Sequence, residues 1–103
     1  MEENFATDLN ISANVIETIL ARTVEGIDGV MSLSKKTRKQ APLNVENTEE
    51  GVIVDVHIIV VYGEKIAEIA ANVRAAVALT IEEQVGVPVV AVNVFVEDIV
   101  FPE

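Results

Sequence analysis

His57 is the only histidine of the chain, and Asp55 lies two residues before it. In an extended segment these two side chains share a face, so they could touch and form a general-base pair. No motif places a serine beside them, and the chain has no cysteine that could act as a nucleophile. We therefore interpret His57 as a surface or interface histidine, and the catalytic interpretation stays the minor alternative.

The segment Gly26-Ile27-Asp28-Gly29 has the G-x-x-G spacing of the RNA-binding KH loop, which clamps backbone phosphates. Here a carboxylate occupies the middle of the loop, where it would repel phosphate. Glycines commonly follow the last turn of a helix, and this role explains both of them. The segment favours a helix end over a phosphate clamp.

A basic run stands out against the acidic composition. It holds four of the seven basic residues of the chain, which are Lys35, Lys36, Arg38 and Lys39. The simplest interpretation is a solvated loop. Two alternatives stay open: docking onto the acidic surface of a neighbouring copy, and contact with a foreign anion such as nucleic acid or anionic lipid.

No segment carries a recognisable cofactor or metal motif. The acidic pairs at 49–50, 82–83 and 97–98 lack the spacing of a calcium loop, and the absence of cysteine excludes thiolate sites. The phosphate-binding loop, the dinucleotide fingerprint, H-E-x-x-H and G-x-S-x-G are all missing. We expect no catalytic residue, no cofactor and no metal.

Hydrophobic periodicity predicts the elements that position these residues. Helical spacing from Ser12, a plausible N-cap, predicts a helix of about four turns with a stripe that begins at Val15. A second helix is expected over 64–85. Alternation predicts strands over 30–33, 43–45, 52–62 and 89–100.

The composition supports one sheet-rich domain. The chain has 103 residues, a formal net charge of −10, and 50% apolar residues, among them 19 valines and 11 isoleucines. β-branched side chains suit a pleated surface, and the acidic surface disfavours nucleic acid. We expect a flexible acidic arm over 1–10 and one domain over 11–103. Its fold class is α/β (α+β), a two-layer sandwich in the order α-β-β-β-α-β, with a mixed sheet of about four strands and two helices on one face.

Two helices can cover only one side of such a sheet. The opposite face would show Ile53, Asp55, His57, Ile59 and Val61 of the long strand. On the last strand it would show Ala91, Asn93, Phe95, Glu97 and Ile99. The apolar members Ile53, Ile59, Val61 and Phe95 predict a surface that another protein covers, although isolated apolar side chains on a surface are also ordinary.

Four blocks in this order resemble the alkaline shock protein family, the general or envelope stress response family of Gram-positive bacteria. They are Ile11–Ile16, Val24–Val30, the strand Val54–Gly63 that ends in Tyr-Gly, and Val92–Val96 with its V-N-V-x-V pattern. The resemblance covers residues 9 to 100. It implies a non-enzymatic scaffold or adaptor that self-associates and supports the cell envelope.

The resemblance also implies a location and partners. Some relatives are held at the membrane by a separate anchoring protein and self-assemble, so we expect a cytoplasmic, homo-oligomeric chain with a membrane-anchored partner. The longest apolar stretch, 58–62, is far shorter than the roughly 20 residues that span a bilayer. Two alternatives remain: a nucleic-acid-binding regulator that uses the loop 35–39, and a regulator of lipid or fatty-acid synthesis.

Overall fold

The computed structural model describes residues 13–35 and 41–101. Within these ranges two helices and four strands follow each other in the predicted order, and the second helix ends in a short π-helical segment. The elements are α2 (Ala13–Glu25), β1 (Val30–Leu33), β2 (Leu43–Thr48), β3 (Gly51–Val61), α3 (Ile66–Thr80), η1 (Ile81–Val85) and β4 (Val89–Val100).

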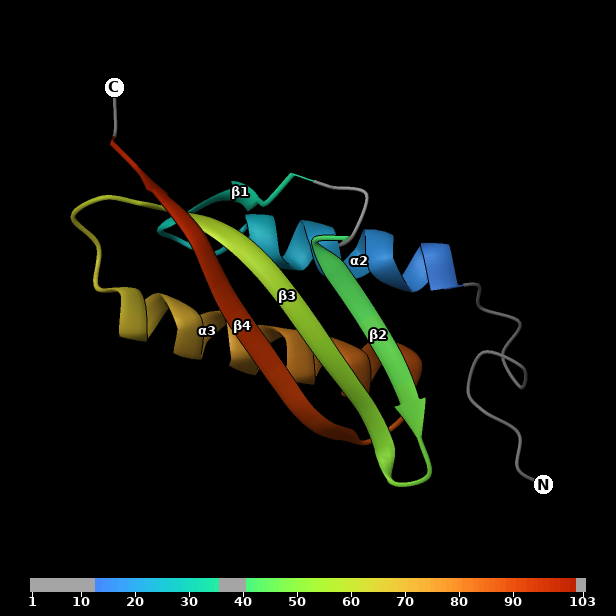
Figure 1. Cartoon of the computed structure of the whole chain (residues 1–103). Helices are drawn as coiled ribbons and strands as arrows, with labels where there is room; N and C mark the ends of the chain where they lie inside the picture. The colour runs from blue at the N-terminus through green and yellow to red at the C-terminus, as the bar shows by residue number, and fades with distance from the viewer. Residues whose placement is uncertain (1–12, 36–40, 102–103) are drawn as a thin grey trace.

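The molecule has two layers, with α2 and α3 side by side behind one face of the sheet (Figure 1). The even-numbered residues of β3, from Val52 to Val60, are at most 1% exposed and point toward the helices. Each helix contributes one apolar stripe to the same core, as the 3.6-residue period predicts. The stripes are Ile16, Leu20 and Val24 of α2, and Ile69, Val73, Val77, Ile81 and Val85 of α3 and η1.

The sheet is mixed, with β3 at its centre. β4 runs parallel to β3 along one edge, as the strand–helix–strand connection predicts. β1 and β2 both pair with the opposite edge of β3 in antiparallel fashion, β1 with its second half and β2 with its first. They therefore lie end to end, like one strand that is interrupted between Leu33 and Leu43.

Several boundaries differ from the sequence-based expectation. β2 extends to Thr48, whose hydroxyl donates to the Gly51 carbonyl in the hairpin turn. α3 begins at Ile66 instead of residue 64, and its C-terminal end widens into η1. Val15 is 50% exposed, so the apolar stripe of α2 begins one residue later than predicted. The expected cap Ser12 and the arm over 1–10 lie outside the described residues.

The pairing of β3 with β4 contains two register shifts, one between Val52 and Ile53 and one between Ile58 and Ile59, and the second changes the face that Ile99 occupies. Ile58 pairs with Val96, but Ile59 pairs with Asp98. Ile99 is consequently opposite Val60, a residue of the helix-facing row, and Val100 is opposite Val61. The expectation that Ile99 lies on the uncovered face is therefore wrong, because the bulge inserts one residue into β4 and inverts the alternation after it.

Candidate interaction surface

The sheet face that α2 and α3 leave uncovered is called the open face here, and the strands β3 and β4 form most of it. It carries the four apolar residues that were predicted to lie there. Ile53, Ile59 and Val61 are half-buried, and Phe95 is 44% exposed. The structure thus brings these four side chains to one side of one sheet, while their role in binding stays a prediction.

Side-chain contacts between β3 and β4 fix the orientation of the residues in the middle of the open face. His57 Nδ1 lies 2.7 Å from Glu97 Oε2, and the His57 ring stacks on Phe95 with centroids 4.6 Å apart. Asn93 donates from Nδ2 to the Asp55 carboxylate at 2.9 Å. Because Phe95 is stacked and His57 is bonded to a strand neighbour, an exposed aromatic ring is presented in a fixed orientation.

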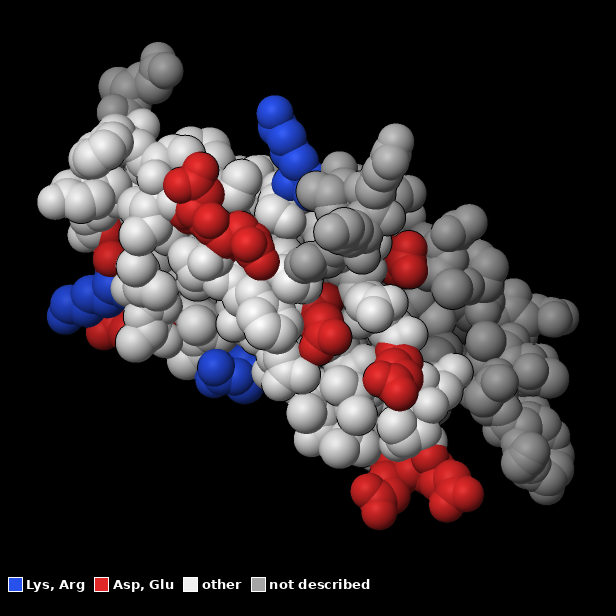
Figure 2. Space-filling model, in the orientation of Figure 1, with Lys and Arg blue, Asp and Glu red and all other residues white. Residues whose placement is uncertain are grey.

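The open face is acidic. Glu46 pairs with Ile53 in the ladder, and Asp55, Glu97 and Asp98 add three further carboxylates. None of the four strands contains Lys or Arg. Figure 2 views the molecule from this side, with carboxylates scattered over the sheet and blue side chains only at the margins. A partner that binds here would gain from positive charge around an apolar centre.

Described residues before and after the basic run are hydrogen-bonded to His57. The Ser34 amide donates to the His57 carbonyl, and the His57 amide donates to the Pro42 carbonyl. The segment that separates β1 from β2 therefore lies between Ser34 and Pro42, the two residues that make these bonds. Lys35 is exposed at its start. Lys36, Arg38 and Lys39 lie outside the described residues.

A second exposed apolar cluster, formed by Tyr62 and Phe101, lies where β3 and β4 end, and neither residue was among the predicted interaction residues. The rings of Tyr62 and Phe101 are 4.7 Å apart, and these residues are 58% and 72% exposed. The Tyr62 amide donates to the Val100 carbonyl, which ties the two strand ends together. Parallel strands bring their carboxyl ends to the same edge of a sheet. An aromatic residue at or directly after the end of each of two predicted parallel strands would therefore have indicated this contact.

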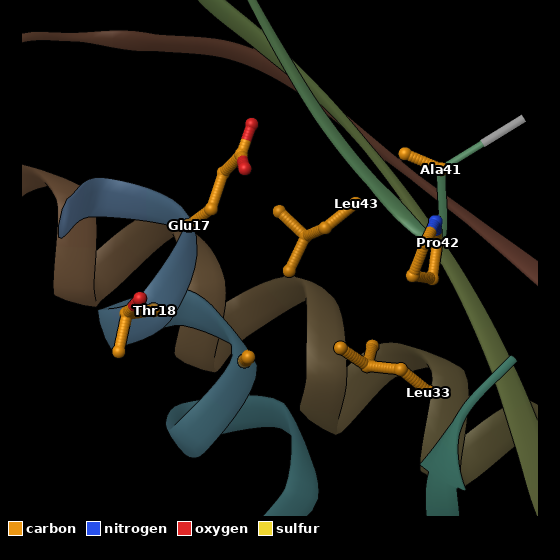
Figure 3. Close-up of a pocket in the computed structure, with 7 residues that line it drawn as sticks. Glu17, Thr18, Leu33, Ala41, Pro42 and Leu43 are labelled. Atoms are coloured by element: carbon orange, nitrogen blue, oxygen red, sulfur yellow. The ribbon is translucent and has the colours of Figure 1, made fainter. Parts of the chain in front are cut away.

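A shallow pocket of about 330 Å³ lies between α2 and the point where β1 and β2 are interrupted. Figure 3 shows Leu33 and Leu43 in the space between the helix and the strand ends. The wall is mostly apolar and includes one carboxylate. The lining residues are Glu17, Thr18, Ala21, Leu33, Ala41, Pro42 and Leu43.

Asp55 and His57, considered above as a general-base pair, are hydrogen-bonded across the sheet to Asn93 and Glu97 respectively. Over residues 13–35 and 41–101, no three His, Asp or Glu side chains are grouped so that they could hold a metal ion. In the same ranges no helix combines the length and hydrophobicity that crossing a membrane would need.

Solved structures with the same fold are C-terminal domains named MamM CTD. A manganese form matches with a TM-score of 0.64 and 17% sequence identity, and covers 84% of this chain and 99% of that domain. A second MamM CTD structure matches with a TM-score of 0.56 at 14% identity, with the same coverage. At this level of identity the likeness concerns the fold alone.

Sequence relatives come from two bacteria. The protein Spy1614 of Streptococcus pyogenes serotype M6 is 31% identical, over 88% of this chain and 86% of its own length. YloU of Bacillus subtilis is 33% identical, over 70% of this chain and 60% of its own length. The profile of one family, described by its cell envelope-related function, matches residues 1–101. This chain belongs to that family, the alkaline shock protein 23 family.

Proposed function

We propose that this chain is a non-enzymatic scaffold or adaptor of the cell-envelope stress response, which acts by self-association and by contacts with other proteins. The cell envelope-related function of the family supports a role at the cell envelope. The open face supports the mode of action, because it combines half-buried isoleucines with an exposed aromatic ring on a rigid sheet. Aromatic anchors of this kind dominate the energetics of protein interfaces.

The observation that carries the proposal is the stack of Phe95 on His57. A phenylalanine that is 44% exposed but held against a neighbouring ring loses little rotamer freedom when a partner covers it. Binding then costs less conformational entropy than it would with a mobile side chain. The bonds of His57 to Glu97 and of Asn93 to Asp55 keep the surrounding polar groups satisfied at the rim of the ring.

The charge distribution favours an indirect link to the envelope. Anionic lipid would be repelled by a chain of net charge −10 whose open face carries only acidic charges among the described strands. This repulsion supports a link to the membrane through a partner protein that contributes the positive charge, and we propose a cytoplasmic chain that binds such a partner.

The test compares the full-length chain with two variants by sedimentation velocity at micromolar concentration and by affinity pull-down from the native host. Phe95→Ser removes the exposed ring of the open face. Leu79→Ser is the matched control, because Leu79 is 54% exposed on α3, on the other layer. We expect the wild type and the Leu79 variant to self-associate and to recover the same partner, and the Phe95 variant to lose the partner. A wild-type chain that is strictly monomeric and recovers no partner would contradict the proposal.

A further inference from the structure

The two edges of the sheet differ in how they could receive another strand. One edge is divided between β1 and β2 and interrupted by the loop between them. The other edge is β4, twelve residues long and rich in valine. Within the described residues β4 pairs only with β3, so the backbone groups on its outer side have no strand partner. A long apolar edge strand is a template for pairing with another chain.

The parallel ladder shows which backbone groups point outward. Val52 is in register with Val89, yet its amide donates to the carbonyl of Pro88, the residue before. Each residue of β3 whose amide and carbonyl point toward β4 thus bonds to the two residues that flank its partner in β4. The amide and carbonyl of the partner itself point away from β3, toward the outer edge. His57 uses its amide and carbonyl toward β2 and β1, so Val56 faces β4. Val94, the partner of Val56, therefore presents its own N–H and C=O to the outer edge.

We propose that a second copy of this chain pairs with the outer edge of β4, antiparallel and centred near Val94. The proposal rests on the self-association that we propose as part of the function, and it names the surface responsible. Two antiparallel copies related by a two-fold axis use the same strand on both sides, so the interface closes after two chains.

The distribution of charge along β4 selects the antiparallel arrangement. Its only charged residues, Glu97 and Asp98, lie in the C-terminal third. Parallel pairing in register would place these carboxylates directly opposite their copies, which is destabilising. Antiparallel pairing about Val94 places Glu97 opposite Ala91 of the second copy. The two Glu97 side chains are then about 20 Å apart along the strands, beyond the screening length of about 8 Å at physiological salt.

The same acidic residues limit the pairing to the apolar part of β4. The Ile99 amide donates to the Asp98 carboxylate at 2.8 Å, which occupies a backbone donor next to the register shift. Bulges and charged side chains are devices that block an edge. They leave the stretch from Ala91, just after the first register shift, to Val96, in which Asn93 is the only polar residue. Within it, residue 92 of each copy lies opposite residue 96 of the other copy, on either side of the central Val94.

Pairing at this edge also enlarges the open face. Phe95 of one copy is placed opposite Asn93 of the other, on the same side of the joined sheet. The two stacks of Phe95 on His57 then lie close to the two-fold axis, and the open faces of both copies form one continuous surface. This arrangement leaves the apolar residues of β3 available to a third protein.

The first test removes the outward donor. Val94→Pro lacks the amide that faces the second copy, and an outward-facing position on an edge strand is where proline is tolerated. Val94→Ala trims the side chain but keeps the amide, and so serves as the matched control. We expect the dimer dissociation constant from sedimentation equilibrium to rise at least tenfold for the proline variant and to change little for the alanine variant. Circular dichroism verifies that both remain folded.

The second test examines the register between the two β4 strands and needs no proline substitution. In the antiparallel pair Ala91 lies opposite Glu97 of the second copy. Ala91→Lys should therefore tighten the dimer and Ala91→Glu weaken it, with dissociation constants about tenfold apart at low salt and converging as salt is raised. Equal dissociation constants for the two variants would overturn the antiparallel register.

The outcomes separate this inference from the proposed function. A wild-type dimer that is unaffected by both Val94→Pro and the Ala91 pair overturns edge pairing, while self-association stands. A wild-type monomer that still recovers a partner by pull-down overturns pairing with a second copy and leaves the adaptor function intact. A monomer that recovers nothing contradicts both.

Discussion

The imidazole of His57 lies against the ring of Phe95, with the two planes 13° apart and the centroids 4.6 Å apart. This contact joins the central strand to the edge strand on the open face. It places an exposed phenylalanine in one orientation, beside a carboxylate that the same histidine binds.

We expect His57→Ala to lower the free energy of unfolding by about 1 kcal/mol, because it removes the ring stack and a hydrogen bond to the Glu97 carboxylate, which is 45% exposed. Urea titration measures this change. Glu97→Gln is the control: it removes the charge but leaves the stack, so its effect should be smaller. Equal losses in the two variants would show that the stack contributes nothing.

The adjacent residues Ile58 and Ile59 test the assignment of the two faces. Ile58 is fully buried against the helices, whereas Ile59 lies half-buried on the open face. Ile58→Ala should cost about 2–5 kcal/mol through lost burial and the cavity left behind, and Ile59→Ala about 1 kcal/mol. Thermal or urea unfolding of the pair measures the difference. A larger cost at Ile59 would mean that the helices cover the other face.

Gly51 begins β3 at a point where the chain approaches Pro88 closely. Its φ is +146°, and a Cβ atom there would lie 2.5 Å from the Pro88 carbonyl oxygen. That oxygen also accepts the Val52 amide, so it cannot move freely. We expect Gly51→Ala to destabilise the chain by about 2–4 kcal/mol through overpacking and backbone strain.

The control for this prediction is Gly63→Ala. Gly63 also has a positive φ, +101°, but a Cβ atom there would have no heavy atom within 4 Å. It should cost only the backbone strain, about 1 kcal/mol. If both variants unfold at the same urea concentration, the close approach of Gly51 to Pro88 has no energetic consequence.

The elements follow from local patterns, which is why the sequence predicts them well. The alternation of apolar residues from Val52 to Val60 predicts both the strand and its buried face, and the stripe through Val73 and Val77 predicts the second helix. The placement of Ile53, Ile59 and Phe95 on one face follows from the same period of two.

The register could not be predicted, because it depends on hydrogen bonds between distant segments. The shift between Ile58 and Ile59 moves Ile99 to the helix side, and the sequence contains only a faint signal of it. Apolar residues of the helix-facing row are two apart from Val92 to Val96 and then three apart to Ile99. The adjacent acids between them mark the inserted residue. The end-to-end position of β1 and β2 likewise depends on which part of β3 each one pairs with.

The basic run 35–39 gives the last prediction, which concerns nucleic acid. We expect the full-length chain not to bind a single-stranded RNA at about 150 mM salt, because four cations on a chain of net charge −10 neutralise few phosphates. Fluorescence anisotropy with a labelled oligonucleotide measures this. Binding at low salt through the run would fall with a log–log slope no steeper than about −3, since each neutralised phosphate of a single strand contributes about −0.7. Changing Lys35, Lys36, Arg38 and Lys39 to Gln should abolish it, and Arg74→Gln on α3 should not. Tight binding that persists at physiological salt and disappears in the quadruple variant would instead favour the nucleic-acid-binding regulator.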